Sequence, residues 1–321
     1  MRLAYIAPRW DYGDPARGLS MEETTFHSAL VGMGHEVHHF DFLERASAVG
    51  EHEMNRELLD FVREVEPAMA FFVLFKDEVT VDTIEAITAS GVITCNWFTD
   101  DHWRFDSFSR HYAPALSLVA TTDAAAVAKY HGIGYHRVLL TQWACNVHAY
   151  SPCAKQPRPE ATFVGQRYGD RPKAVEAIRR AGFPVDCYGF GWESGRLGHD
   201  EMIELFGASS INLNFSKAYR GRLWRRRPLT FQIKARPFEV AGCGGFVLTE
   251  QAPLLERYFE SGREIATFEG IADLVEQVRY WLSNEEERAA VARRGYERVI
   301  REHTYEHRFE EIFRAAGLAD R

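Results

Sequence analysis

The chain has 321 residues, of which 46% are hydrophobic and 26% charged, and its net charge is −8. This balance excludes a disordered chain, and the acidic total disfavours nonspecific binding to nucleic acid. The first apolar stretch is too short for a signal peptide, no window reaches the length of a membrane span, and the five cysteines contain no CxxC pair. We therefore expect a cytoplasmic globular protein with no transmembrane segment, no nucleic-acid partner and no metal.

The first half of the chain alternates between short apolar strands and amphipathic helices. A capping box, Ser20 to Glu23, predicts the start of the first helix, which Gly34 ends. The predicted strands are 3–7, 37–42, 69–75, 92–98, 116–121 and 137–140, and the further helices are 55–65, 81–89 and 124–131. Such alternation is typical of a parallel, doubly wound sheet.

Residues 151–160 contain three prolines among polar residues and read as a linker. The alternation then resumes, with predicted strands at 161–165, 185–190, 211–215, 245–249 and 265–268, and predicted helices at 171–181, 201–206, 237–243 and 271–282. A second capping box, Ser283 with Glu286, predicts another helix. A last helix is predicted from Thr304, with Tyr305, Phe309, Ile312 and Ala316 on one face.

These patterns predict an α/β protein with two Rossmann-like domains. The expected parts are an acceptor domain at 1–150, the linker 151–160, a donor domain at 161–303 and a C-terminal helix at 304–321 that packs back on the first domain. Two such domains in tandem leave a cleft, and ligands of parallel sheets bind beyond the carboxyl ends of the strands.

The most informative segment runs from Ile233 to Glu250. Pro237 suits the first turn of a helix, and the N–H groups at a helix N-terminus bind phosphate. Lys234 and Arg236 add positive charge there. Glu239, one turn into the helix, is placed either to accept hydrogen bonds from both hydroxyls of a ribose or simply to stabilise the helix N-terminus.

This segment resembles the C-terminal half of GT-B glycosyltransferases, specifically the spore-maturation, CgeB-like branch. The matching pattern is Arg236-x-Phe238-Glu239, Gly244-Gly245, Val247–Thr249, Gly262–Glu264, Asp273-Leu274, Glu286–Arg288, Gly295, His303–Tyr305 and Arg308. The resemblance implies that Glu239 holds the donor ribose and that Arg236 lies near the diphosphate. Many retaining members carry a second Glu eight positions before the first, where this chain has Phe231.

Other residues complete the predicted donor site. Gly165 and Arg171 flank a glycine-bearing loop, either as phosphate contacts or as an ordinary turn. Tyr188 precedes an aromatic loop, residues 189–192, that either stacks on a base or packs as a turn, and Thr249 ends a predicted strand. Arg222 belongs to a basic stripe, Lys217 to Arg236, with eight basic residues and no acidic one. Arginine pairs well with phosphate, although a solvated basic loop is the alternative.

The predicted acceptor site follows the fourth strand, in the run Trp97 to Trp103. An acceptor hydroxyl needs a general base, and Asp101 or His102 is the preferred candidate, with Asp100 beside them. Tryptophan faces suit sugar rings. A capped loop with a structural Asp is the alternative, and a metal site on these three residues is less favoured because no further ligand cluster lies nearby. His27, His35, His38 and His39 are assigned surface or structural roles.

The sequence therefore predicts a metal-independent glycosyltransferase with no tightly bound cofactor. It moves a sugar from a nucleoside diphosphate sugar (UDP, GDP or dTDP) to the hydroxyl of an unknown acceptor, either a saccharide or an anionic molecule. Inversion is preferred because the second Glu is missing. The alternatives are a GT-B type sugar-nucleotide epimerase and a noncatalytic sugar-nucleotide-binding protein.

Overall fold

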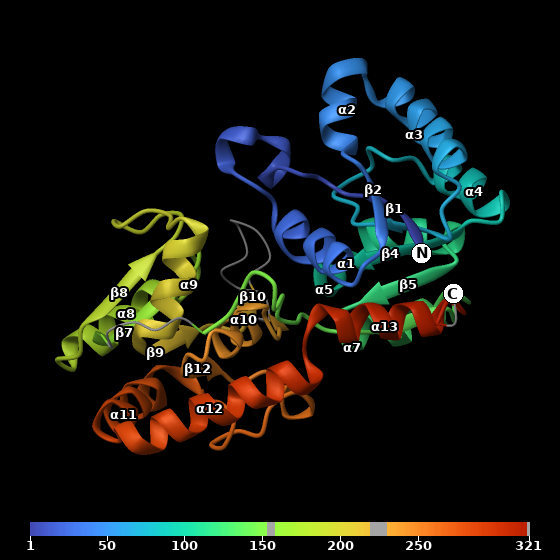
Figure 1. Ribbon diagram of the computed structural model, residues 1–321. Coiled ribbons are helices and arrows are strands. Elements are labelled where there is room, and N and C mark those ends of the chain that lie inside the picture. The colour runs from blue at the N-terminus through green and yellow to red at the C-terminus, as the bar shows by residue number, and fades with distance from the viewer. Residues whose placement is uncertain (153–157, 219–229, 320–321) are drawn as a thin grey trace. The chain divides into compact units, whose positions relative to one another are not determined.

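The computed structural model describes residues 1–152, 158–218 and 230–319 (Figure 1). The chain divides into two compact units. Unit 1 contains residues 1–142 and 305–321, and unit 2 contains residues 143–304. Within the described ranges, none of the helices combines the length and hydropathy that crossing a bilayer requires.

Unit 1 is built on a parallel sheet of six strands in the order β2-β1-β3-β4-β5-β6. Parallel strands buried on both faces are expected to be short and apolar, as these are. The strands are β1 (Arg2–Ile6), β2 (Glu36–Phe40), β3 (Met69–Phe72), β4 (Ile93–Phe98), β5 (Leu118–Thr121) and β6 (Val138–Leu140). All six predicted strands are therefore present, most of them one to three residues shorter than expected.

Helices cover both faces of this sheet. On one face, Ala4, Ile6 and Phe72 share a core with side chains from α3 (Glu51–Val65) and α4 (Val81–Ala89). The remaining helical segments of unit 1 before the last helix are η1 (Asp11–Gly13), η2 (Pro15–Arg17), η3 (Glu23–His27), α1 (Ser28–Gly32), α2 (Phe42–Val49), α5 (Asp101–Arg104), η4 (Phe105–Ser109), α6 (Arg110–Tyr112), η5 (Ala113–Ala115) and α7 (Ala124–Gly132).

The last helix, α13 (Tyr305–Ala315), packs on the opposite face of the unit 1 sheet, as predicted. Its Phe309 lies 5.4 Å from Phe71 between ring centroids, and its Tyr305 lies 5.2 Å from Phe26. The predicted apolar face of this helix is buried throughout. A segment some 300 residues from the N-terminus therefore completes the core of unit 1.

Unit 2 repeats the architecture with a parallel sheet of five strands in the order β13-β12-β9-β7-β8. They are β7 (Arg158–Val164), β8 (Val185–Tyr188), β9 (Ser209–Asn214), β12 (Val247–Glu250) and β13 (Ala266–Phe268). A small antiparallel hairpin, β10 (Lys217–Ala218) with β11 (Thr230–Phe231), was not predicted.

The two faces of the unit 2 sheet have separate cores. One contains side chains from α8 (Arg171–Arg180) and α11 (Gly270–Ser283), and the other contains side chains from α9 (His199–Ala208), α10 (Arg236–Gly242) and α12 (Glu285–Glu302). A short helical turn, η6 (Leu255–Arg257), belongs to the second core. Both units are thus doubly wound α/β structures, and the predicted fold class is confirmed.

The two predicted capping boxes differ from the structure. Ser283 lies inside α11 and donates to the Arg279 carbonyl, so it does not cap α12. Ser20 does cap the first helix, because its Oγ accepts from Glu23 N at 3.0 Å. The reciprocal bond is missing, since Ser20 N donates to the Arg9 carbonyl at 2.8 Å. The side chain of Glu23 therefore points elsewhere.

Candidate functional site

Arg236 and Glu239 form an ion pair at the beginning of α10. Arg236 Nη1 lies 2.7 Å from Glu239 Oε2, and the Glu239 side chain is nearly completely buried. The guanidinium also lies 4.8 Å above the Phe206 ring, and Nη1 is 3.2 Å from the sulfur of Met202. The start of α10 therefore holds a buried carboxylate against a partly exposed arginine.

The other basic residues of this region are only partly described. Lys234 Nζ donates to Gln232 Oε1 at 2.7 Å, just before α10 begins. Arg222 and the rest of the predicted basic loop, Arg220 to Arg227, lie outside the described residues. The structure therefore places Lys234 near the start of α10 and leaves the role of the loop a prediction.

A second charged cluster, which the sequence reasoning missed, joins the carboxyl ends of β9 and β12 to the start of α8. Lys217 Nζ lies 2.7 Å from Glu250 Oε1 and 2.9 Å from Asp170 Oδ2. Glu250 Oε2 also accepts from the backbone N–H groups of Ser216 and Lys217. Burial acts to lower the pKa of Lys217, but its hydrogen bonds to Glu250 and Asp170 outweigh this effect and the pKa is raised. The sequence feature that could have indicated this cluster is Glu250, a carboxylate directly after the predicted strand 245–249.

Arg171 holds the loop that precedes α8. Its Nη1 donates to the Gln166 carbonyl at 2.8 Å and its Nη2 to the Tyr168 hydroxyl at 3.1 Å. The guanidinium lies 4.0 Å above the Tyr168 ring. Arg171 is mostly buried, so the loop itself uses much of the hydrogen-bonding capacity that was predicted for a phosphate.

Gly165 provides close packing between two loops of unit 2. A Cβ at Gly165 would lie 2.7 Å from the Phe163 ring, and a Cβ at Gly189 would clash with the Gly165 carbonyl oxygen. Trp192 Nε1 donates to the same carbonyl at 2.9 Å, so Trp192 is part of a packed turn. Phe190 is 73% exposed and is the aromatic side chain of this loop that remains accessible to a base.

Tyr188 and Thr249 lie at or near the carboxyl ends of two strands of the same sheet, β8 and β12, which β9 and β7 separate. Tyr188 is half-buried at the end of β8, where its carbonyl accepts from Gly165 N at 2.9 Å. Thr249 is buried in β12, and its hydroxyl accepts from Asn214 Nδ2 at 2.8 Å. Thr249 thus links β9 to β12, while Tyr188 lies at the edge where the two glycines meet.

In unit 1, the predicted acceptor residues lie at the start of α5, beyond the carboxyl end of β4. Asp101 is 1% exposed, and its Oδ2 accepts from the hydroxyls of Thr121 at 2.6 Å and Tyr130 at 2.9 Å. Burial raises the pKa of Asp101 although these hydrogen bonds oppose the effect. Asp100 and His102, which flank it, are half-buried. Asp101 therefore ties α5 to β5 and α7, and the more accessible candidates are its neighbours.

The predicted pair of sugar-stacking tryptophans is wrong for Trp97. This side chain lies in the core against Phe26, 4.7 Å away between ring centroids, because it points to the face that α13 covers. Trp103 and Tyr12 are instead exposed beyond the carboxyl ends of β4 and β1. A cavity of about 330 Å³ opens nearby, lined by Lys76, Asp77, Arg104, Ser107, Phe108, His111 and Tyr112.

Residues 171–314 match a family of proteins described as glycosyl transferase-like. This range begins at α8 and includes the Arg236–Glu239 pair and Glu250. No curated protein has a sequence that matches the chain significantly. The match therefore covers the donor half of the prediction and does not extend to the residues around Asp101.

Solved structures match the whole chain in fold. Sucrose-phosphate synthase from Thermosynechococcus elongatus has a TM-score of 0.65 at 9% identity and covers 100% of both chains. Anabaena HepE in complex with UDP and glucose has a TM-score of 0.66 at 10% identity and covers 99% of both chains. A glycosyltransferase from Rickettsia africae has a TM-score of 0.65 at 10% identity and covers 98% of this chain and 97% of its own. The chain therefore has the GT-B glycosyltransferase fold.

Proposed function

We propose that the protein is a glycosyltransferase that moves a sugar from a nucleoside diphosphate sugar to an acceptor hydroxyl. The observation that carries the proposal is the buried Glu239 paired with Arg236, which lies inside the segment that matches glycosyl transferase-like proteins. The full-length likeness to HepE, which is described in complex with UDP and with UDP-glucose, supports a uridine nucleotide as the first donor to test. Within this family we keep the CgeB-like branch as our assignment.

In the proposed mechanism, Glu239 accepts hydrogen bonds from the donor ribose and Arg236 lies toward the diphosphate. Departure of the nucleoside diphosphate places negative charge on the leaving phosphate, and fixed arginine and lysine charges favour that change. Arg236, Lys234 and the basic loop around Arg222 supply such charge, so transfer is proposed to be metal-independent. Gly165, Arg171, Tyr188 and Thr249 hold the loops and strand ends around this position.

On the acceptor side, His102 and Asp100 are the proposed bases for the hydroxyl. Asp101 is buried behind them and is proposed to position the start of α5. Trp103 and Tyr12 offer exposed aromatic faces to a saccharide, and Lys76 and Arg104 line a cavity suited to an anionic group. We propose an inverting transfer, because Phe231 occupies the position of the second Glu found in many retaining enzymes.

The testing experiment measures thermal unfolding with UDP, GDP, dTDP, ADP and CMP, each with and without EDTA. A ligand present at about 100 times its dissociation constant, and bound only to the folded state, adds roughly 2.7 kcal/mol. We expect a shift with one nucleoside diphosphate that EDTA does not change and that Glu239→Ala abolishes. Absence of a shift with every nucleotide would refute the donor site.

The matched control for Glu239→Ala is Glu276→Ala. Glu276 pairs with Arg279 three residues away on α11 at 2.8 Å, but both side chains are exposed. This variant should retain the nucleotide shift.

Product analysis with UDP-sugar then separates the alternatives. Acceptor-dependent transfer supports the proposal, conversion of the donor sugar without acceptor indicates an epimerase, and binding without turnover indicates a noncatalytic protein.

A further inference from the structure

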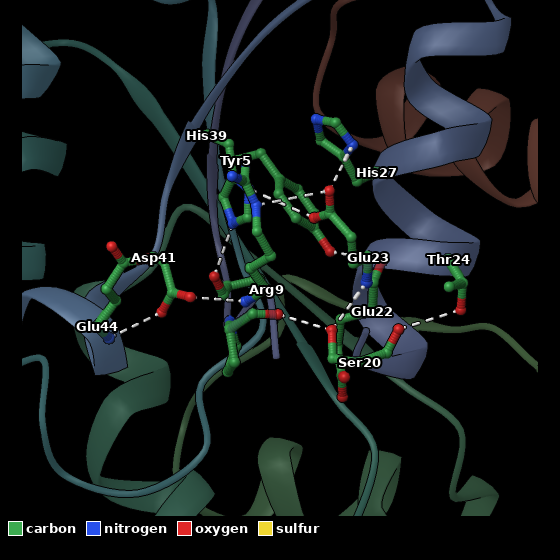
Figure 2. Close-up of polar contacts among 12 residues, drawn as sticks. Tyr5, Arg9, Ser20, Glu22, Glu23, Thr24, His27, His39, Asp41 and Glu44 are labelled. Carbon is green, nitrogen blue, oxygen red and sulfur yellow. Dashed lines mark hydrogen bonds and ion pairs between the residues drawn. The ribbon is translucent and has the colours of Figure 1, made fainter. Parts of the chain in front are cut away.

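Three potential metal ligands converge in unit 1 at a place that the proposed transfer reaction does not use. Glu23 and His27 lie in η3, and His39 lies in β2 (Figure 2). One ligand atom from each residue falls within 4.8 Å of the other two. Glu23 Oε1 lies 3.4 Å from His27 Nδ1, and Glu23 Oε2 lies 3.3 Å from His39 Nδ1.

The hydrogen bond of His39 fixes which ring nitrogen faces Glu23. His39 Nε2 lies 2.8 Å from the Ala7 carbonyl oxygen, which only accepts hydrogen bonds, so Nε2 carries the hydrogen. His39 Nδ1 is then the ring nitrogen that faces the carboxylate. A backbone carbonyl on the far nitrogen is the arrangement that orients histidine ligands in metal sites.

The Glu23 carboxylate has ion-pair contacts with both histidines, but one of its oxygens has no hydrogen bond among the described residues. Its Oε2 is buried and, within the described ranges, makes no hydrogen bond. The capping role predicted for it is absent, since Ser20 N donates to Arg9 instead. Glu23 Oε2 and His39 Nδ1 therefore face each other at 3.3 Å, and a cation shared between these two atoms would satisfy both.

The spacing of these atoms suits a metal ion. Zinc binds imidazole nitrogen and carboxylate oxygen at about 2.0–2.2 Å, which separates two tetrahedral ligand atoms by about 3.4 Å. Charge-assisted hydrogen bonds are shorter, about 2.7–2.9 Å. The two observed separations, 3.3 and 3.4 Å, match the metal geometry.

We infer that Glu23, His27 and His39 bind one divalent cation of the zinc class through three protein ligands. Two imidazoles and one carboxylate are a donor set that zinc and its neighbours prefer, and three ligands leave one coordination position open. The segment Glu23–His27 is a π-helix, a local irregularity that frequently marks functional sites.

Arg9 is the competing cation at this site. Its Nη2 lies 3.2 Å from His39 Nδ1 and its Nε lies 3.9 Å from Glu23 Oε1. The guanidinium thus competes with a metal for His39 and Glu23, but 45% of its side-chain surface is exposed and it can turn outward. Removal of Arg9 should therefore tighten metal binding, whereas a purely structural ion-pair network would only be weakened by it.

The test titrates the metal-free, full-length protein with Zn²⁺ by calorimetry and with Co²⁺ by visible absorption. We expect one equivalent of Zn²⁺ to bind and Co²⁺ to give the intense bands of four-coordination. His27→Ala and His39→Ala should each weaken binding by more than about 100-fold, since even a group that only orients a ligand contributes 10–100-fold. Glu23→Gln should weaken it, and Arg9→Ala should strengthen it.

The matched control is His38→Ala. His38 lies beside His39 in β2 but pairs with Glu36 at the exposed surface, so its loss should leave binding unchanged. Far-ultraviolet circular dichroism verifies that each variant folds. The Co²⁺ spectrum is recorded on the unaltered protein, so this measurement does not depend on the folding of any variant. Three results would each overturn the inference: no saturable binding, octahedral Co²⁺, or His27 and His39 variants that bind the metal as tightly as the unaltered protein does. In the donor test, each nucleotide shift is the difference between samples with and without nucleotide at the same EDTA concentration. The donor proposal and the metal proposal can therefore fail independently.

Discussion

Arg236 Nη1 lies 2.7 Å from Glu239 Oε2, and the two residues are one helical turn apart at the start of α10. The pair is asymmetric, because Glu239 is buried while Arg236 retains an exposed part. Arg236 is therefore the member of the pair that is open to solvent. The predicted diphosphate contact, Arg236, and the predicted ribose contact, Glu239, both belong to this one short helix.

Replacing Glu239 with Gln should weaken binding of the preferred nucleoside diphosphate by about 10- to 100-fold, because hydrogen bonds to a charged group contribute about 1.5–3 kcal/mol. The side chain keeps its shape, so the fold should be retained. Calorimetric titration measures the affinity, and the exposed Glu276→Gln variant is the control. Unchanged affinity in Glu239→Gln would remove Glu239 from the donor site.

Asp101 is expected to act on stability. Asp101→Ala leaves the buried hydroxyls of Thr121 and Tyr130 without their acceptor and should lower the free energy of unfolding by about 2–4 kcal/mol. Asp101→Asn keeps an acceptor oxygen and should cost less. Denaturant unfolding at neutral pH compares the two variants, and an Ala variant as stable as the parent would contradict the structural role.

The pH dependence of the same variants gives a second prediction. Burial raises the pKa of Asp101 in the folded state, so the folded protein holds this proton when the unfolded chain has lost it. The contribution of Asp101 to stability therefore falls as the pH rises above about 3.9, the unfolded value. Asn has no titrating carboxyl, so Asp101→Asn lacks this pH-dependent contribution. The stability of Asp101→Asn relative to the parent should therefore increase as the pH rises above about 3.9. A constant difference would be inconsistent with the raised pKa.

The architecture was predictable because its signal is local. Each strand of the two parallel sheets overlaps a strand predicted from the sequence, and the face of α13 follows a simple helical spacing. The helices of residues 101–115 were missed because their aromatic side chains pack without a clean period. Trp97 was misassigned because the sequence does not show which sheet face the C-terminal helix will cover.

The candidate sites were less predictable because they depend on distant partners. Glu250 and Lys217 are 33 residues apart and meet only when β9 pairs with β12. Glu23 and His39 likewise meet through the packing of η3 on the sheet. Glu23 fits a capping box in the sequence, and the competing ion pairs appear only in three dimensions.

Gly189 should tolerate alanine poorly. Its φ is +121°, and an added Cβ would clash with the Gly165 carbonyl oxygen, which Trp192 also contacts. Gly189→Ala should therefore cost about 2–5 kcal/mol of unfolding free energy from strain and overpacking together. Gly182→Ala is the matched control, because Gly182 has φ +90° with nothing within 4 Å, and should cost about 1–2 kcal/mol. Equal costs in thermal or denaturant unfolding would show that the contact with Gly165 is unimportant.

Lys217 and Glu250 should be energetically coupled. Lys217→Met leaves the buried Glu250 carboxylate without its cation and should cost about 3 kcal/mol, whereas the double variant with Glu250→Gln should recover at least about 1 kcal/mol of that loss. Because the pKa of Lys217 is raised, the stabilisation should be present below about 10.4 and decline as the pH rises further. A double-mutant cycle by denaturant unfolding at neutral pH, repeated at alkaline pH, measures both effects. Strict additivity at neutral pH would mean that the backbone N–H groups of Ser216 and Lys217 alone hold Glu250, since they remain in every variant.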